Sequence, residues 1–363
     1  MDGPVTIREI AKRAGVSIGT VSHVINGTAG VREQVRQRVL EAIRSLNYQP
    51  SQLGRGLRRN QTSMLGMIIP DVTNPFFPAV IRGVEDVAYR RSYRVVLCNT
   101  DNDRKEISYL NELESYRPAG LLLIPAAESR VAAPLNRLAA SGAPVVCIDR
   151  QPPGWKGDVV LVDNEEGTYN ATRHLLRMGH RKLAVITGPQ HLANAVQRLK
   201  GFQRALKEAK ISIEPEYIQE ARFDRHSGYD AAMRLLRMLP RPSAILACND
   251  MMALGTLQAV RESNLRCPEE VSIVGFDNLE FTEFTAPALT SVHQPGYQLG
   301  ATAARRLLER LDGLSPEPRT IVLQTELRIR SSVSAIEVTN SKPLARTKRR
   351  FVPRATVMKR GGL

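Results

Sequence analysis

The chain has 363 residues, 42% hydrophobic and 24% charged, a composition that excludes a wholly disordered or fibrous protein and fits two or three globular domains. No apolar run reaches the roughly 18 residues of a membrane span, and the start lacks a secretory signal, so we expect a cytoplasmic protein without membrane contact. The net charge is +15, and the two ends are strongly basic: residues 1–61 hold ten Lys or Arg against four Asp or Glu, and residues 338–363 hold eight against none. Basic ends beside a neutral middle indicate contact with a polyanion.

The first sixty residues predict three short helices. Thr6 and Glu9 form a capping box that begins the first helix, and Gly15 ends it in a left-handed conformation. Ser17 caps a second helix, and a third runs from about Arg32 to Leu46. Arg32 is a poor capping residue, so we expect a weak cap or a phosphate contact there. Two helices joined by a tight turn make a helix-turn-helix, whose second helix enters the major groove of DNA.

The first turn of that second helix would face the base edges. This places Ile18, Gly19, Ser22 and His23 at the DNA. Ile18 can pack on a thymine methyl group, and His23 can donate or accept a hydrogen bond. The alternative is a purely structural helical trio, but the turn spacing, the caps and the local positive charge favour DNA.

From Met64 onward, apolar strands alternate with amphipathic helices such as 79–91. The predicted strands are 64–69, 94–98, 120–124, 144–148, 159–162, 183–187, 244–247 and 271–274. Runs that are apolar on both faces indicate parallel sheets covered by helices, and two such sheets fit this length. Ligands of such sheets bind beyond the carboxyl ends of the strands.

Polar and aromatic side chains follow these strands in the sequence. They are Asn74, Phe76, Phe77, Asp149, Arg150, Arg198, Phe223, Asn249, Asp277 and Gln294. Aromatic faces stack on the C–H surface of a sugar, while carboxylate, amide and guanidinium groups bind its hydroxyls. Each residue alone could equally be a core ring or a surface ion pair, but the set is what a monosaccharide needs.

The segments TIREIAKRAGVS (6–17) and TVSHVING (20–27), followed by YQP (48–50), resemble the headpiece of the lactose/galactose repressor family of bacterial transcription regulators. The resemblance spans about residues 5–335. It implies a helix-turn-helix headpiece joined to an α/β core like that of periplasmic binding proteins, with two parallel-sheet lobes between which the chain crosses near residues 162, 291 and 323.

The domain boundaries follow from this resemblance. We expect a headpiece at 1–49, a hinge at 50–61, an effector-binding and dimerisation domain at 62–337, and a basic, disordered tail at 338–363. Within the core, lobe 1 covers about 62–161 and 292–322, and lobe 2 covers about 162–291 and 323–337.

The resemblance also implies residue roles. DNA contacts come from Thr6, Ser17, Ile18, Gly19, Thr20, Ser22, His23, Asn26, Arg55 and Leu57. In the family the hinge folds into a helix on the operator, and the residue at the position of Leu57 wedges into the minor groove. Gly54 and Gly56 weaken a helix here, so we expect the hinge to order only on DNA.

The sequence therefore predicts a homodimeric transcription repressor that binds double-stranded operator DNA and responds to a small-molecule effector. The ten polar and aromatic residues match positions of ribose-type relatives, which favours a ribose-like pentose. Leu192 stands where purine-type relatives have Arg, which weakens a purine effector. Control by a phosphorylated carrier protein and, in another class, a sugar-binding transport component remain alternatives.

No catalytic, cofactor or metal motif is present, so we expect neither enzymatic activity nor a cofactor. The residues Val80, Ile81, Val84 and Val87 share one helix face, which is either a dimer seam or intramolecular core. Four widely spaced cysteines, Cys98, Cys147, Cys248 and Cys267, predict buried free thiols.

Overall fold

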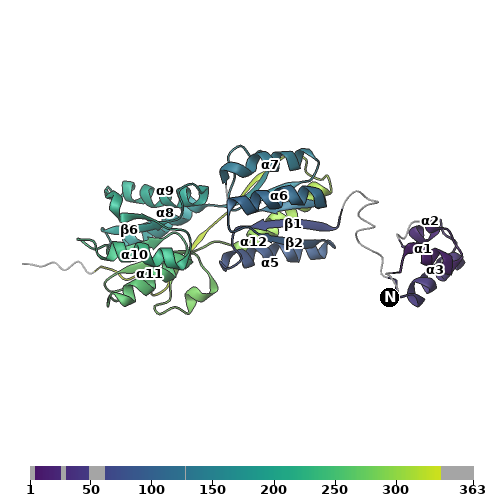
Figure 1. Cartoon of the computed structure of the whole chain (residues 1–363). Helices are drawn as coiled ribbons and strands as arrows, with labels where there is room; N and C mark the ends of the chain where they lie inside the picture. Colours follow the sequence, from purple (N-terminus) through teal and green to yellow (C-terminus); the bar gives the residue numbers. More distant parts are fainter. Residues whose placement is uncertain (1–4, 26–29, 49–61, 127, 337–363) are drawn as a thin grey trace, which may run out of the picture.

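The computed structural model describes residues 5–25, 30–48, 62–126 and 128–336, and its N-terminal part is the expected helical trio (Figure 1). The helices are α1 (Ile7–Ala14), α2 (Ile18–Ile25) and α3 (Glu33–Ser45). Ile10, Val21 and Val39, one from each helix, are fully buried at the centre of the trio. This small core fixes the angle at which α2 is presented.

The helix ends follow the capping rules. The carboxylate of Glu9 accepts hydrogen bonds from the backbone N–H of Thr6 at 2.6 Å and from its hydroxyl at 3.0 Å, which lowers the pKa of Glu9. Gly15 ends α1 at φ 66°, and the hydroxyl oxygen of Ser17 accepts from the backbone N–H of Thr20 at 3.1 Å. Arg32 makes no side-chain cap at α3, so the weak cap is confirmed.

Lobe 1 is built on a six-stranded sheet in which every strand pair is parallel. In spatial order its strands are β11 (Thr320–Leu323), β5 (Asp158–Val162), β4 (Val145–Ile148), β3 (Gly120–Leu123), β1 (Met64–Ile69) and β2 (Arg94–Asn99). Its helices are α5 (Phe76–Arg90), α6 (Asp103–Tyr116), α7 (Glu128–Ala140) and α12 (Gly296–Leu311). Separate apolar clusters join α5 and α12 to one face of the sheet and α6 and α7 to the other, so both faces are covered.

Lobe 2 repeats the plan with one antiparallel pair, β10 and β12. Its strands, in spatial order, are β12 (Glu326–Arg328), β10 (Thr290–His293), β9 (Ser272–Asp277), β8 (Ala244–Ala247), β6 (Leu183–Thr187) and β7 (Ile218–Glu220). Its helices are α8 (Asn164–Arg177), α9 (Ala193–Glu208), α10 (Arg225–Leu236) and α11 (Asp250–Glu262). All eight predicted strands are present in the two sheets, and the predicted fold class is confirmed.

The chain passes between the two sheets three times. It crosses after β5, between β10 and α12, and between β11 and β12. Because β10 continues to His293, the second crossing falls just beyond residue 293 rather than near 291. Figure 1 shows the two lobes side by side, with each sheet flanked by its helices.

Glycines let helices touch within each lobe. A Cβ on Gly201 of α9 would lie 2.1 Å from the carbonyl oxygen of Glu165 on α8, and a Cβ on Gly300 of α12 would lie 2.0 Å from the carbonyl oxygen of Val80 on α5. The α10–α11 crossing repeats this contact at Gly255. These approaches leave no space for a methyl group, so the glycines set the helix spacing.

Of the two alternatives for the apolar face of α5, the structure supports intramolecular core at Val80 and Val84. Val80 and Val84 are fully buried against lobe 1, and Ile81 and Val87 pack on the same cluster. An apolar stripe at helical spacing marks a buried face, but it does not reveal whether α12 or a second chain covers it.

The four cysteines are free, as predicted, although Cys98 and Cys267 are only half-buried. Burial raises the pKa of Cys248 and of Cys267 to about 12, which keeps both as thiols at neutral pH. Among the described helices, none combines the length and the apolar character that a membrane crossing requires.

Replacing Gly201 by alanine is expected to destabilise lobe 2 by about 2 kcal/mol, because α8 and α9 must separate to admit the methyl group. Urea unfolding followed by circular dichroism measures this loss. Lys200→Ala, at the neighbouring exposed position of the same helix, is the control and should change stability by less than about 0.5 kcal/mol. Equal stability of the two variants would contradict the tight crossing.

Candidate DNA interface and effector cleft

The exposed face of α2 holds the predicted DNA-reading residues. Ser17, Ile18, Gly19 and His23 are exposed, with Ile18 at 38%, while Val21 and Val24 turn inward. Thr20 and Ser22 are half-buried, and Thr6 is exposed at the start of α1. An exposed apolar Ile18 in the first turn is suited to a methyl group in the major groove. Asn26, Arg55 and Leu57 lie outside the described residues.

A cleft of about 600 Å³ lies at the carboxyl ends of the strands of both lobes. All ten predicted effector residues line it: Asn74, Phe76, Phe77, Asp149, Arg150, Arg198, Phe223, Asn249, Asp277 and Gln294. This volume lies in the range of small-molecule sites. The convergence follows from topology, because the carboxyl ends of parallel strands share one edge of each sheet.

Lobe 1 contributes aromatic rings and an ion pair. Phe76 and Phe77 meet edge to face with ring centroids 5.4 Å apart, and the side-chain oxygen of Asn74 accepts from the Phe76 backbone N–H at 3.1 Å. Arg150 donates to the carbonyl of Pro125 at 2.7 Å, and its Nε lies 3.3 Å from Oδ2 of Asp149. These contacts hold both rings and both charges at the wall of the cleft.

Lobe 2 is organised around the buried guanidinium of Arg198. It donates to Oδ1 of Asn164 at 2.8 Å, to the carbonyl of Cys248 at 2.5 Å and to Oε1 of Gln294 at 2.7 Å. Its Nη1 lies 3.7 Å from Oδ1 of Asp277. Burial raises the pKa of Asp277 well above its usual value, and the positive charge of Arg198 opposes this shift.

Three of the predicted effector residues have a strained backbone. Asp149, Phe223 and Asp277 have φ of 66°, 64° and 113°. Residues other than glycine rarely adopt these φ values, and such backbone strain concentrates at ligand-binding sites. Asp149 directly follows β4, Asp277 ends β9, and Phe223 lies in the loop after β7. The unusual backbone conformation at these points turns each side chain toward the cleft.

Asn194, at the start of α9, is a functional candidate that the sequence reasoning missed. Its amide donates to Oδ2 of Asp149 at 3.0 Å and so links lobe 2 to lobe 1 across the cleft. Within the described part of the chain, Asp149 Oδ1, Asn194 Oδ1 and Gln294 Nε2 are buried polar atoms without a hydrogen-bond partner. Buried polar atoms left unpaired around a cavity are suited to a ligand that carries hydroxyl groups. In the sequence, Asn194 could have been found from its position two residues after Leu192, which also lines the cleft.

Known protein families match both the N-terminal helices and the α/β core of this chain. Residues 6–51 match the family described as "Bacterial regulatory proteins, lacI family", and residues 172–333 match a "Periplasmic binding protein-like domain". The HTH-type transcriptional repressor PurR of Histophilus somni (strain 2336) is 38% identical over 333 residues, which cover 91% of this chain and 99% of that protein. The chain belongs to the LacI family of bacterial regulatory proteins.

Solved structures of the family share this fold over most of the chain. The lac repressor dimer bound to operator and the anti-inducer ONPF is 27% identical with a TM-score of 0.82, covering 92% of this chain and all of that one. A LacI family regulator from Enterococcus faecium with bound ribose is 31% identical with a TM-score of 0.69, covering 76% of this chain and all of that one. As a member of this family, the chain is a DNA-binding transcriptional repressor, and the predicted family is confirmed.

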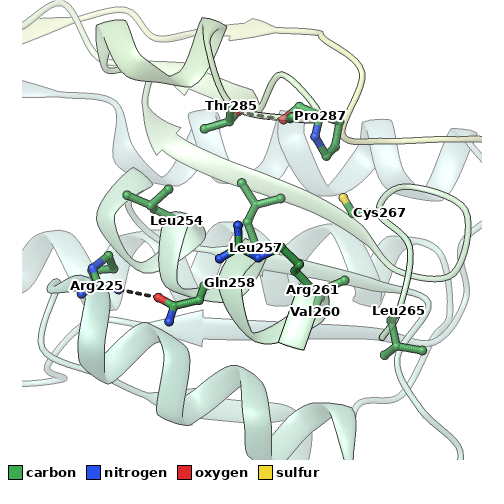
Figure 2. A pocket seen from close by; sticks show the side chains of 11 residues that line it. Arg225, Leu254, Leu257, Gln258, Val260, Arg261, Leu265, Cys267, Thr285 and Pro287 are labelled. Carbon is green, nitrogen blue, oxygen red and sulfur yellow. Dashed lines mark hydrogen bonds between the residues drawn. The ribbon is translucent and has the colours of Figure 1, made fainter. Parts of the chain in front are cut away.

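A second hollow, of about 470 Å³, lies on lobe 2 away from all ten effector residues. Figure 2 shows Leu254 and Leu257 on α11 beside Thr285 and Pro287, with Arg225 bonded to Gln258 at one end. Its lining mixes the apolar side chains Leu254, Leu257 and Val260 with the polar side chains of Arg225, Gln258 and Arg261.

Proposed function

We propose that this repressor binds a near-palindromic operator as a homodimer and is controlled by a monosaccharide, a ribose-like pentose, in the interlobe cleft. The observation that carries the proposal is the convergence of all ten predicted residues on one cavity. Unpaired buried oxygens on Asp149 and Asn194 can accept from sugar hydroxyls, and the unpaired amide of Gln294 can donate. The three phenylalanines supply faces for the C–H surface of the ring.

A purine is the second candidate, because relatives that cover nearly the whole chain are named PurR. The ring faces of Phe76 and Phe223, which line the cleft, suit a planar base as well as a sugar. Against this, Leu192 is 6% exposed and lines the cleft at the position where purine-type relatives carry Arg. An apolar side chain there offers no donor to a base, which favours the sugar.

The two further alternatives have less support. A transport component has no use for the helix-turn-helix whose reading face is exposed on α2. Control by a phosphorylated carrier protein would leave the unpaired polar atoms of the cleft without a role. Both alternatives predict no response of operator binding to pentoses.

Isothermal titration calorimetry with D-ribose, D-xylose, L-arabinose, adenine and guanine tests the effector. We expect a pentose to bind, and Asp277→Ala to abolish the effect of that pentose on operator binding in a gel shift while operator binding itself persists. Asp312→Ala, which removes an exposed carboxylate of lobe 1, is the control and should respond like the unchanged chain. Binding of a purine base and of no pentose would overturn the sugar assignment.

The hinge remains a prediction because it lies outside the described residues. Leu57→Ala is expected to weaken operator binding, because the wedge that kinks the central base step is lost. Effector affinity should stay nearly unchanged, since the cleft is built entirely from residues beyond 62. Fluorescence anisotropy with operator duplex measures the first quantity, and equal operator affinity would contradict the wedge.

For the dimer we propose the face of lobe 2 that carries the second hollow. Phe284 is 78% exposed and directly precedes the hollow's rim residues Thr285, Ala286 and Pro287. A twofold axis brings the same patch of both copies together, so a projecting ring and a hollow that contains Leu254, Leu257 and Val260 can engage reciprocally on one face. A second copy of this chain is therefore the occupant that fits.

Phe284→Ser is expected to convert the dimer to a monomer without unfolding, because the ring is mostly exposed in the single chain. Size-exclusion chromatography with light scattering measures the mass. Leu239→Ser, which removes another exposed apolar side chain of lobe 2 at 94% exposure, is the matched control and should remain dimeric. A dimeric Phe284→Ser variant would remove this face from the proposal.

A further inference from the structure

Asp250 is a fully buried carboxylate at the first position of α11, and it does not line the cleft. Its two oxygens accept from two different elements of lobe 2. The hydroxyl of Ser291 on β10 donates to Oδ1 at 2.6 Å, and the backbone N–H of Leu279 donates to Oδ2 at 2.7 Å. Gly275 of β9 makes room for this carboxylate, since a Cβ there would lie 2.2 Å from Oδ1.

No positively charged side chain of the described residues lies within ion-pair distance of the Asp250 carboxylate. No ion pair to it occurs among the described residues; Arg330 is the nearby cation, and Asp277 is a nearby carboxylate. Burial raises the pKa of Asp250 to about 7, although the bonds from Ser291 and Leu279 and the charge of Arg330 oppose the shift. A buried carboxylate without an ion pair lowers the stability of the fold, which indicates that the two hydrogen bonds it accepts have a role of their own.

The segment that Asp250 holds reaches both the cleft and the other lobe. It begins at Asp277, which pairs with Arg198, and its Asn278 N–H donates to the same Ser291 hydroxyl at 3.1 Å. The side chain of Leu279 is 8% exposed and belongs to the apolar cluster of lobe 1 that contains Phe76 and Phe77. Leu279 is thus bonded to lobe 2 through its backbone and buried on lobe 1 through its side chain.

We propose that Asp250 is a positioning residue that fixes the segment 277–279, so that Asp277 faces the effector while Leu279 seats on lobe 1. Through this segment, occupancy of the cleft and contact between the lobes depend on one another. Met251, the next residue of α11, and Phe281 pack on the same lobe 1 cluster and extend the contact. The inference deepens the proposed function of the cleft and rests on it for the effector, but not for the lobe contact.

Two substitutions of Asp250 separate positioning from bulk stability. Asparagine retains an oxygen to accept from the Leu279 N–H, and its amide can donate to Ser291, whose hydroxyl turns to accept. Alanine removes both acceptors and leaves the Leu279 N–H unsatisfied. Asp230→Asn, the same chemical change at an exposed position on α10, is the matched control.

Hydrogen–deuterium exchange of the full chain without effector tests the lobe contact. In Asp250→Ala, we expect peptides covering 277–284 and, across the cleft, 76–84 to exchange about tenfold faster, while β6 and β8 keep their protection. Asp250→Asn should stay within about threefold of the unchanged chain, and Asp230→Asn should match it. If Asp250→Ala does not fold, Ser291→Ala should show the same local pattern, because it removes the hydroxyl that donates to Asp250 and accepts from the Asn278 N–H.

Two outcomes overturn the proposal. Uniformly faster exchange throughout lobe 2 with no change at 76–84 would show a merely structural role, and unchanged exchange at 277–284 would show none. Calorimetry with D-ribose provides the second readout: Asp250→Ala should weaken binding about tenfold, and Asp250→Asn should preserve it. Failure of D-ribose to bind the unchanged chain would count against the sugar effector alone, because the exchange experiment contains no effector.

Discussion

The cleft depends on one buried cation, the guanidinium of Arg198, which is 3% exposed. A guanidinium removed from water must have its donors satisfied, and this one finds oxygens on α8, at the end of β8 and at the crossing into α12. The ring of Phe276 lies 3.7 Å beneath it. By binding these elements together, Arg198 fixes the floor of the cleft in lobe 2, and its attraction for Asp277 holds that carboxyl group beside the ligand space.

The elements that sequence reasoning found are those whose signal is local. Apolar runs marked eight of the strands, and Thr6, Gly15 and Ser17 marked helix ends through hydrogen bonds within one turn. The strands β7, β10, β11 and β12 were not found. β7 and β12 are only three residues long, and β10 begins with the polar residues Thr290 and Ser291, so none of these three shows a continuous apolar run. Three of the four, β7, β11 and β12, lie at sheet edges, where one side lacks a neighbour and the apolar pattern is weak.

The ten cleft residues could be predicted for a different reason. Most of them follow strand ends, which parallel topology brings together at one edge of each sheet. Phe76, Phe77 and Arg198 lie inside helices and were indicated by the family resemblance, which did not include Asn194. The burial of Val80 and Val84 beneath α12, and of Leu279 on lobe 1, depends on segments about 200 residues apart, which periodicity along one helix or loop does not encode.

The link from cleft to DNA must be carried by a difference between two states. A ligand shifts an equilibrium only by its differential affinity, and a full reversal from 1:99 to 99:1 requires about 5.5 kcal/mol. Contacts that exist only when the lobes are together are where that difference can arise. Two such contacts are the hydrogen bond between Asn194 and Asp149 and the packing of Leu279 against lobe 1. They lie on different elements beside the cavity. A ligand that pairs the remaining atoms of Asp149 and Asn194 would strengthen the first contact directly. It would act on the second through Asp277, two residues before Leu279, so one binding event reaches both lobes without any new contact outside the cleft.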